Sequence, residues 1–188
     1  MFKDEARKSL LQKRRNLTPK DCIQWDDLLL IQLQRLNFSN IHTIGSFYPM
    51  EKYNEPNAIL LTNYLQQFIP DLVIAYPVID QVLGTMNFYE ATHELVLNSL
   101  GIHEPNQNKM IPSEQIDCFL VPLLGFDLLG HRIGFGKGYY DKYFFSCHHA
   151  PLRIGISYFD PLPNIQDTHE FDVPLTHCIT PWNSYEFK

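Results

Sequence analysis

Residues 41–78 read IHTIGSFYPMEKYNEPNAILLTNYLQQFIPDLVIAYPV, and this stretch decides the fold. Residues 41–48 form an apolar run typical of a buried strand, and residues 72–78 form a second. Between the two runs, residues 55–68 predict a helix that is entered through Pro56. A strand, a helix and a second strand at this spacing are typical of a parallel unit.

The flanking sequence adds elements of the same kind. Residues 3–16 are rich in helix formers, and Thr18 predicts an N-cap for a second helix that ends near Leu36. The remaining elements are expected as a hairpin strand at 84–89, a Pro-Asn turn at 104–106, strands at 116–122, 152–158 and 177–181, a tight turn at 127–130 and a helix after 137. We therefore expect one domain over residues 1–188: a three-layer, Rossmann-like α/β domain with a mostly parallel sheet flanked by helices.

Composition and charge exclude several classes of protein. The formal net charge of -6 argues against a nucleic-acid partner, because phosphate backbones are bound by clustered Lys and Arg. Lys and Arg gather locally in residues 3–15, which fits either a solvated helix face or a site for a small anion. The four cysteines form no C-x-x-C pair, and no signal peptide or membrane span is evident, so we expect a soluble cytoplasmic protein.

A glycine-rich motif follows the expected tight turn, where residues 131–144 read HRIGFGKGYYDKYF. Gly134, Gly136 and Gly138 allow positive φ and a close approach of backbone N–H groups to a ligand, and Lys137 adds a positive charge. A helix starting near Gly138 would add its N-terminal dipole. The motif is either a simple strand-to-helix connection or a polyphosphate site, and Lys137 within the turn favours the phosphate site.

Two further charges frame this motif. Arg132 precedes it and Asp141 follows it. ATP arrives as a magnesium complex, and Mg²⁺ is usually held by one or two carboxylates together with phosphate oxygens and water. Asp141 is therefore either a ligand of that metal or an exposed helix residue paired with a neighbouring lysine.

The residues from Leu120 to Phe144, LVPLLGFDLLGHRIGFGKGYYDKYF, resemble the signature of 5-formyltetrahydrofolate cyclo-ligases, also called methenyltetrahydrofolate synthetases. Similarity extends over nearly the whole chain, through the basic first helix, the MNF of residues 86–88, the GIHEP of residues 101–105 and the C-terminal HEFDVPLTHCIT. The order and spacing of these segments make the resemblance strong.

The resemblance implies an ATP- and Mg²⁺-dependent ligase that forms a C–N bond. The expected reaction converts 5-formyltetrahydrofolate, with or without a polyglutamate tail, to 5,10-methenyltetrahydrofolate, with release of ADP and phosphate. Transfer of the γ-phosphoryl group to the formyl oxygen would turn it into a leaving group, and N10 would then attack the formyl carbon. The protein has only to position the reactants and stabilise charge.

The resemblance also assigns roles to residues of this chain. Lys137 and Arg132 are expected to stabilise the transferring charge, and Asp141 and Asp172 to hold Mg²⁺. Glu55 is expected to bind the pterin, although charge compensation at a helix N-terminus fits it nearly as well. The remaining expected residues are Tyr48 and Tyr140 at the substrate, and Lys3, Arg7, Gly134, Phe135, Gly136, Gly138 and Tyr139, with Arg132 and Lys137, at ATP.

The chain departs from the family pattern at three places. Phe135 stands where many members have arginine, and residues 90–111 match poorly. Residues 50–54, MEKYN, differ from the commoner sequence before the substrate-binding glutamate, so the position of that glutamate is Glu55 to within a residue or two. Two other functions fit the same residues: an ATP-dependent phosphotransferase acting on another small substrate, and a folate-binding protein without activity. We expect a monomer with no nucleic-acid or membrane partner.

Overall fold

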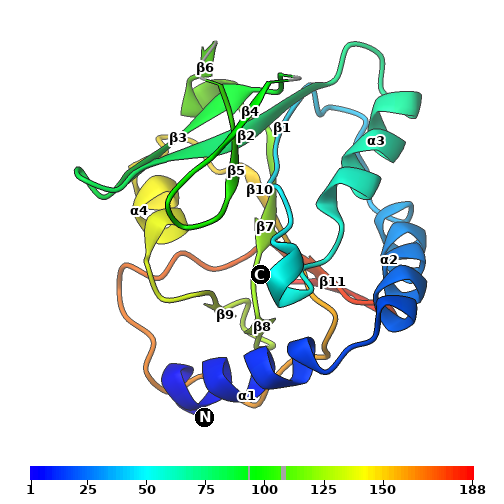
Figure 1. Cartoon of the computed structure of the whole chain (residues 1–188), viewed down its shortest axis with the longest axis vertical. Coiled ribbons are helices and arrows are strands. Elements are labelled where there is room, and N and C mark those ends of the chain that lie inside the picture. Colours follow the sequence, from blue (N-terminus) through cyan, green and yellow to red (C-terminus); the bar gives the residue numbers. More distant parts are fainter. Residues whose placement is uncertain (93, 107–108) are drawn as a thin grey trace.

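The computed structural model describes residues 1–92, 94–106 and 109–188. Within these residues, one sheet contains the strands β1 (Thr43–Gly45), β2 (Val73–Asp80), β3 (Thr85–Glu90), β6 (Met110–Ile111), β7 (Cys118–Pro122), β10 (Leu152–Ile156), β11 (His177–Ile179) and β12 (Ser184–Glu186). Their order is β12-β11-β10-β7-β1-β2-β3-β6 (Figure 1). The strands from β11 to β2 are parallel, whereas β12, β3 and β6 pair antiparallel at the two edges.

Helices cover both faces of this sheet, because its strands alternate apolar side chains between the two faces. The helices are α1 (Lys3–Arg15), α2 (Pro19–Leu33), α3 (Ala58–Phe68) and α4 (Tyr139–Ser146) in the described residues. Cys118 and Leu120 of β7 pack in the cluster that includes α2 and α3. Phe119 and Val121 point the other way, into the cluster that includes α4. The prediction of a three-layer, mostly parallel α/β fold is confirmed.

Aromatic rings fill the layer under α4. Phe119 lies edge-on to Phe88, Tyr143 and Phe144, with ring centroids 5.1, 5.6 and 5.1 Å away. A Cβ atom on Gly45 of β1 would lie 2.5 Å from the Phe119 ring. Glycine at this position lets the ring pack directly on the strand.

α1 lies outside the two helix layers, beyond the ends of the central strands (Figure 1). Its Ala6 and Leu10 pack against Leu124, Ile133 and Ile165, so the helix is held by segments that follow β7 and β10. The basic residues of α1 are thereby brought to the carboxyl end of the sheet, where α/β proteins bind ligands.

Two small antiparallel ribbons complete the described structure. β4 (Leu95–Leu97) pairs with β5 (His103–Pro105), and β8 (Gly125–Phe126) pairs with β9 (Arg132–Ile133). The tight turn predicted at 127–130 joins the second pair: Oδ1 of Asp127 accepts hydrogen bonds from the backbone N–H groups of Leu129 and His131, both at 3.0 Å. The Pro-Asn turn predicted at 104–106 is wrong, because residues 103–105 form β5 and the chain reverses at residues 98–102 instead.

The boundaries of two helices differ from the sequence-based prediction. α2 has the predicted Thr18 cap, with a reciprocal hydrogen bond from the backbone N–H of Thr18 to Asp21, but it ends at Leu33. α3 begins at Ala58 because the Asn57 side chain caps it, accepting from the Leu60 N–H at 3.1 Å. The sequence before it forms the short 3₁₀ helix η1 (Glu51–Tyr53), and Glu55 therefore lies in a loop.

No helix in the described part of the chain is both long enough and apolar enough to cross a membrane.

Candidate active site

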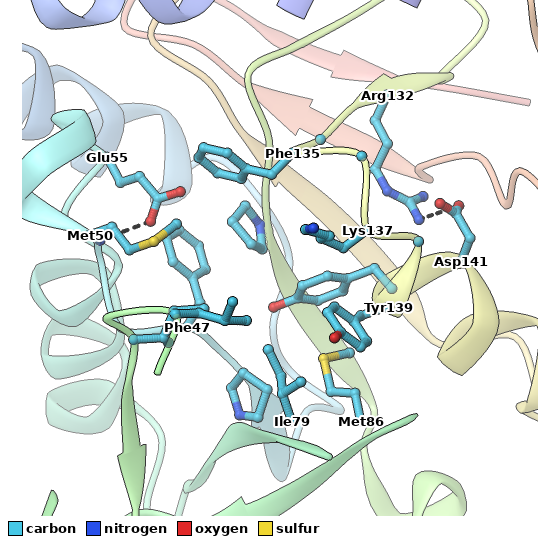
Figure 2. Close-up of a pocket in the computed structure, with 18 of the residues that line it drawn as sticks. Phe47, Met50, Glu55, Ile79, Met86, Arg132, Phe135, Lys137, Tyr139 and Asp141 are labelled. Atoms are coloured by element: carbon cyan, nitrogen blue, oxygen red, sulfur yellow. Dashed lines mark hydrogen bonds and ion pairs between the residues drawn. The ribbon is translucent and has the colours of Figure 1, made fainter. Parts of the chain in front are cut away.

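A cavity of about 490 Å³ lies at the carboxyl ends of β1, β2 and β7 (Figure 2). Phe47 and Tyr48 reach it from the segment after β1, Ile79 from the end of β2 and Pro122 from the end of β7. The residues predicted from the sequence as a site all line this cavity: Lys3, Arg7, Tyr48, Glu55, Arg132, Gly134, Phe135, Gly136, Lys137, Gly138, Tyr139, Tyr140, Asp141 and Asp172. The structure thus brings together residues that are up to 169 positions apart.

The glycine-rich loop between β9 and α4 forms one wall of the cavity. Gly136 has φ +84° and Gly138 has φ +71°, and Gly138 is the N-cap residue of α4. The first backbone N–H groups of a helix have no partner within it and attract anions. The expectation of positive φ was wrong for Gly134, whose backbone has no left-handed conformation and whose carbonyl accepts a hydrogen bond from Nε of Arg7 at 2.9 Å.

Lys137 lies at the exposed part of this loop, and Figure 2 shows its side chain extending into the cavity. Its ammonium group has no hydrogen bond or ion pair with any residue that the structure describes. A cation without a protein partner beside a helix N-terminus is suited to bind an anionic ligand.

Arg132 is fixed on the opposite side of the loop. Its guanidinium donates to Oδ1 of Asp141 and to the carbonyl of Val173, and it lies 5.4 Å from the centroid of the Phe144 ring. Burial lowers the pKa of Arg132, while Asp141 and Asp172 oppose this effect. The side chain is a rigid, oriented cation, in contrast to the exposed Lys137.

The two predicted metal ligands lie next to each other in the fold. The carboxylate of Asp141 accepts a hydrogen bond of 3.2 Å from the N–H of Val173, the residue that follows Asp172. Asp172 itself pairs with the ammonium group of Lys3. Burial raises the pKa of Asp172, but hydrogen bonds from Lys3 and from the backbone of His169 outweigh it and lower the pKa below its usual value.

α1 supplies two cations to the same end of the cavity. Lys3 reaches Asp172, and Arg7 lies against Gly136, where a Cβ atom would be 3.2 Å from Cζ of Arg7. Arg7 also pairs with Asp4 on its own helix. Together with Arg132 and Lys137, these residues give this end of the cavity four cations against the carboxylates of Asp141 and Asp172, and we call it the cationic end.

The opposite end of the cavity contains a buried carboxylate. Oε2 of Glu55 accepts a hydrogen bond of 2.9 Å from the N–H of Met50, whereas Oε1 has no hydrogen-bond partner in the described structure. Figure 2 shows the carboxylate pointing toward the space between Phe135 and Met50. Burial raises the pKa of Glu55, and the positive charge of Arg14 and the Met50 hydrogen bond act against this rise.

The tyrosines of the site differ in their surroundings. Tyr48 stacks on Tyr76 with ring centroids 3.9 Å apart, so one of its faces is already covered. The hydroxyl of Tyr140 is buried without a hydrogen-bond partner in the described structure, and burial, with a contribution from Glu55, raises its pKa. Tyr140 can therefore donate a hydrogen bond to a ligand at neutral pH.

Two sets of site residues were not predicted from the sequence. The first is an apolar wall between the cationic end and Glu55, formed by Phe47, Met50, Tyr53, Pro77, Ile79, Met86, Leu100, Ile102 and Pro122. Apolar side chains at strand ends resemble ordinary core residues, so no sequence signal separates them. The second is Arg14, which lies behind Glu55 within the basic run of α1 and gave no signal that distinguished it from its charged neighbours.

The β4–β5 hairpin contributes to this wall although residues 90–111 resemble the family poorly. Its Leu100 and Ile102 line the cavity. The buried carboxylate of Glu104 accepts hydrogen bonds of 2.8 Å from the N–H of Ile79 and from the Asn98 side chain. Lys52 of η1 donates to the carbonyl of Leu100 at 3.1 Å, so the loop of the hairpin is tied to η1.

Similarity to known proteins covers most of this chain. The family model for the 5-formyltetrahydrofolate cyclo-ligase family matches residues 2–181. A 5-formyltetrahydrofolate cyclo-ligase of Mycoplasma genitalium is 42% identical over 76 residues, which are 40% of this chain and 46% of the relative, so that alignment spans about half of the relative's length. One of Mycoplasma pneumoniae is 30% identical over 162 residues, which cover 84% of this chain and 86% of the relative.

A solved structure has the same fold. The NMR structure of Aquifex aeolicus 5,10-methenyltetrahydrofolate synthetase matches with a TM-score of 0.79 and 27% identity, over 100% of this chain and 94% of that one. The family resemblance inferred from the signature is thus confirmed by the family model, by a relative aligned over most of its length and by a structure. The chain belongs to the 5-formyltetrahydrofolate cyclo-ligase family.

Proposed function

We propose that this protein is a 5-formyltetrahydrofolate cyclo-ligase that uses ATP to convert 5-formyltetrahydrofolate to 5,10-methenyltetrahydrofolate. The observation that carries this proposal is a single cavity with a cationic, glycine-rich end and a carboxylate end, separated by an apolar wall. The cationic end suits a phosphate chain, and the carboxylate end suits a ring with N–H donors. A flat heterocycle fits against the apolar wall between them. Membership of the family supports the same assignment.

The cationic end is the proposed ATP site. Lys137 and Arg132 stabilise the charge that moves between the γ-phosphate and the formyl oxygen, and Lys3 and Arg7 bind phosphate oxygens. The free ammonium group of Lys137 and the first N–H groups of α4 support these roles. Gly134, Phe135, Gly136, Gly138 and Tyr139 form the wall against which the nucleotide lies.

Asp141 and Asp172 fit a magnesium ion by the chemistry of their donors. They supply hard carboxylate oxygens beside the proposed phosphate site, and Mg²⁺ typically takes one or two such ligands and completes its shell with phosphate and water. In the described residues no group of three or more His, Cys, Asp or Glu side chains could hold a metal by itself, which agrees with a metal that arrives with ATP. When bound, the ion would neutralise phosphate charge.

The carboxylate end is the proposed folate site. Oε1 of Glu55, which has no hydrogen-bond partner in the described structure, would accept hydrogen bonds from the amino and ring N–H groups of the pterin. The buried hydroxyl of Tyr140 would donate to an acceptor of the same ring, and Tyr48 would flank it. Burial raises the pKa of Tyr140, so this hydroxyl stays protonated as a donor.

The reaction needs no protein nucleophile. The formyl oxygen attacks the γ-phosphorus of ATP, the bond from phosphorus to the bridging oxygen breaks, and ADP leaves. N10 then attacks the activated formyl carbon, the bond from carbon to the phosphorylated oxygen breaks with its electron pair, phosphate leaves and N10 loses its proton. The residues of the cavity orient these atoms and stabilise the developing charge.

Isotope transfer tests this reaction. 5-Formyltetrahydrofolate labelled with ¹⁸O in the formyl group is incubated with the protein, Mg²⁺ and ATP, and the released phosphate is analysed by mass spectrometry. We expect one ¹⁸O atom in each phosphate, because the formyl oxygen leaves with phosphorus. Unlabelled phosphate together with methenyl product would refute phosphorylation of the formyl oxygen.

The same samples distinguish the alternative functions. A phosphotransferase acting on another substrate would bind ATP but release no phosphate in response to 5-formyltetrahydrofolate. A folate-binding protein without activity would bind the folate and leave ATP intact. Lys137 with the carboxylates of Asp141 and Asp172 argues against the second alternative, because binding of the pterin alone needs neither metal ligands nor a phosphate-binding lysine.

A further inference from the structure

Arg14 is a buried cation that does not line the cavity. Its side chain is 2% exposed, and its Nη1 donates to the carbonyl of Leu123 at 3.1 Å. Its backbone carbonyl accepts a hydrogen bond of 2.9 Å from the Asn54 side chain, which ties the end of α1 to the loop that carries Glu55. Its guanidinium also lies 5.9 Å from the centroid of the Phe135 ring, on the cavity wall. Several elements thus fix the position of this charge.

The charge of Arg14 is directed at Glu55. Nη2 of Arg14 lies 3.9 Å from Oε1 of Glu55, a distance at which the charges attract but do not share a hydrogen bond. The Glu55 side chain is itself 2% exposed. Oε1 is therefore a buried oxygen with both lone pairs unused, and its negative charge has the Arg14 guanidinium nearby.

We propose that Arg14 is a positioning residue for folate binding, which holds Glu55 in its ionised form and in the orientation that presents Oε1 to the substrate. This inference rests on the proposed function. A carboxylate buried without a cation takes up a proton, and a protonated Glu55 would present a donor to the N–H groups of the pterin. Removal of Arg14 should therefore weaken folate binding at neutral pH, and raising the pH should restore it.

The other groups that face Glu55 do not replace Arg14. Tyr140 from α4 is neutral at physiological pH, because burial and Glu55 itself raise its pKa. Lys137 lines the same cavity from the glycine-rich loop, at its cationic end. Met50 provides one backbone N–H, and Tyr53 of η1 is an aromatic neighbour of Phe135.

The test uses steady-state kinetics between pH 6 and 9 on the wild type, Arg14→Met, Glu55→Gln and the double variant. We expect Arg14→Met to raise the KM for 5-formyltetrahydrofolate about tenfold or more at pH 7, and to change the KM for ATP less than about twofold. In the wild type we expect the folate KM to rise as the pH falls, and we call this rise the acidic limb of the profile. In Arg14→Met this limb should move to higher pH by about one unit or more. Glu55→Gln should remove this limb, and the double variant should match Glu55→Gln.

Lys13→Met is the matched control, because it removes an exposed positive charge from the neighbouring position of the same helix. It should leave both KM values and the acidic limb unchanged. The positioning role is overturned if Arg14→Met keeps the wild-type acidic limb, or if its KM values for folate and for ATP rise equally. Only a structural role would then remain.

A second variant keeps the test valid if Arg14→Met does not fold. Arg14→Lys retains a charge, but a single ammonium group cannot reproduce the fork that reaches both Leu123 and Glu55. We expect a smaller increase in the folate KM than in Arg14→Met, with a smaller displacement of the limb in the same direction, and unchanged values would overturn the proposal. Lack of methenyl formation by the wild type would overturn the proposed function itself, whereas normal turnover with an unchanged Arg14 variant would overturn only this inference.

Discussion

Lys137 is the residue on which the proposed chemistry depends most. Its ammonium group extends into the cavity without a partner among the described residues, so truncation removes charge but no structural contact. We expect Lys137→Ala to lower kcat about 10²- to 10³-fold, the usual cost of losing one stabilising group in a transition state. Thermal unfolding should be nearly unchanged, and methenyl formation in steady state measures the effect.

Lys142→Ala provides the control for this variant. Lys142 is exposed on α4, the helix that follows the glycine-rich loop, and donates to the carbonyl of Gly84 at 3.3 Å, outside the cavity lining. The Lys142→Ala variant should retain the wild-type kcat. A Lys137→Ala enzyme within about threefold of the wild type would contradict the assigned role.

The three glycines of the loop should differ in their tolerance of alanine. Gly138 has φ +71° with open space around it, so Gly138→Ala should cost about 1 kcal/mol from backbone strain alone. Gly136→Ala has the same strain and also displaces Arg7, so it should raise the KM for ATP as well. Gly134→Ala has neither problem and should change stability by less than about 0.5 kcal/mol.

Urea unfolding of the three variants checks this order. Equal losses at the three positions would show that the loop conformation in solution differs from the one described here. The sequence predicted the glycine loop because the chemistry of such a turn is local. It could not distinguish Gly134 from the other two, since the hydrogen bond from Arg7 of α1 to the Gly134 carbonyl arises only in the fold.

At the scale of elements, the β4–β5 hairpin is held to the cavity by Glu104. Its carboxylate accepts hydrogen bonds from Ile79 and Asn98, while Leu100 and Ile102 line the cavity. Glu104→Ala should destabilise the fold by about 1.5 to 3 kcal/mol, because it leaves a buried N–H without an acceptor. It should also raise the folate KM more than the ATP KM, which steady-state kinetics measures.

Glu104→Gln separates this effect from a loss of charge. The amide oxygen of glutamine can still accept a hydrogen bond from Ile79, so this variant should keep most of the stability and a near-normal KM. If alanine and glutamine at this position behaved alike, the hairpin would not be held by these hydrogen bonds.

The same hairpin shows why parts of the fold could not be predicted from the sequence. The pattern around Pro105 indicated a turn, yet residues 103–105 form a strand because they pair with β4 and because Glu104 bonds to β2. Such pairing depends on tertiary contacts that a local pattern does not contain. The central strands were predicted well because continuous apolar runs are typical of strands buried on both faces.

For the whole molecule, the N-terminal helix is attached to the C-terminal segment through Lys3 and Asp172. Asp172 has a lowered pKa in the folded chain, so its ionised form stabilises the fold above the usual pKa near 3.9, and this stabilisation is lost as the pH falls through the lower folded value. Asp172→Asn should therefore be less stable than the wild type at pH 7, and the difference should shrink on acidification below about pH 4.

Urea midpoints at pH 7 and at acidic pH measure this dependence. The exposed Asp27→Asn is the control and should follow the wild type at both. A difference between Asp172→Asn and the wild type that stays constant with pH would contradict the ionic role of Asp172.

That the chain is a single domain and a monomer stays a prediction, which one cooperative unfolding transition and sedimentation analysis would check.

The candidate site also shows which residues could be predicted from the sequence and which could not. The signature located Lys137, Arg132 and Asp141 because they lie within ten residues of one another. Arg14 lay outside the prediction, since its meaning arises only when α1 brings it 3.9 Å from Glu55. Local chemistry is readable from the sequence, whereas the pairing of distant charges requires the fold.

The most direct test of the account is the near-ultraviolet absorbance of the protein with 5-formyltetrahydrofolate and Mg²⁺, recorded with and without ATP. We expect the methenyl product band to grow only when ATP is present, and this growth to be lost in Lys137→Ala. A flat trace from folded protein that binds ATP would contradict the account, because the cavity would then serve another substrate.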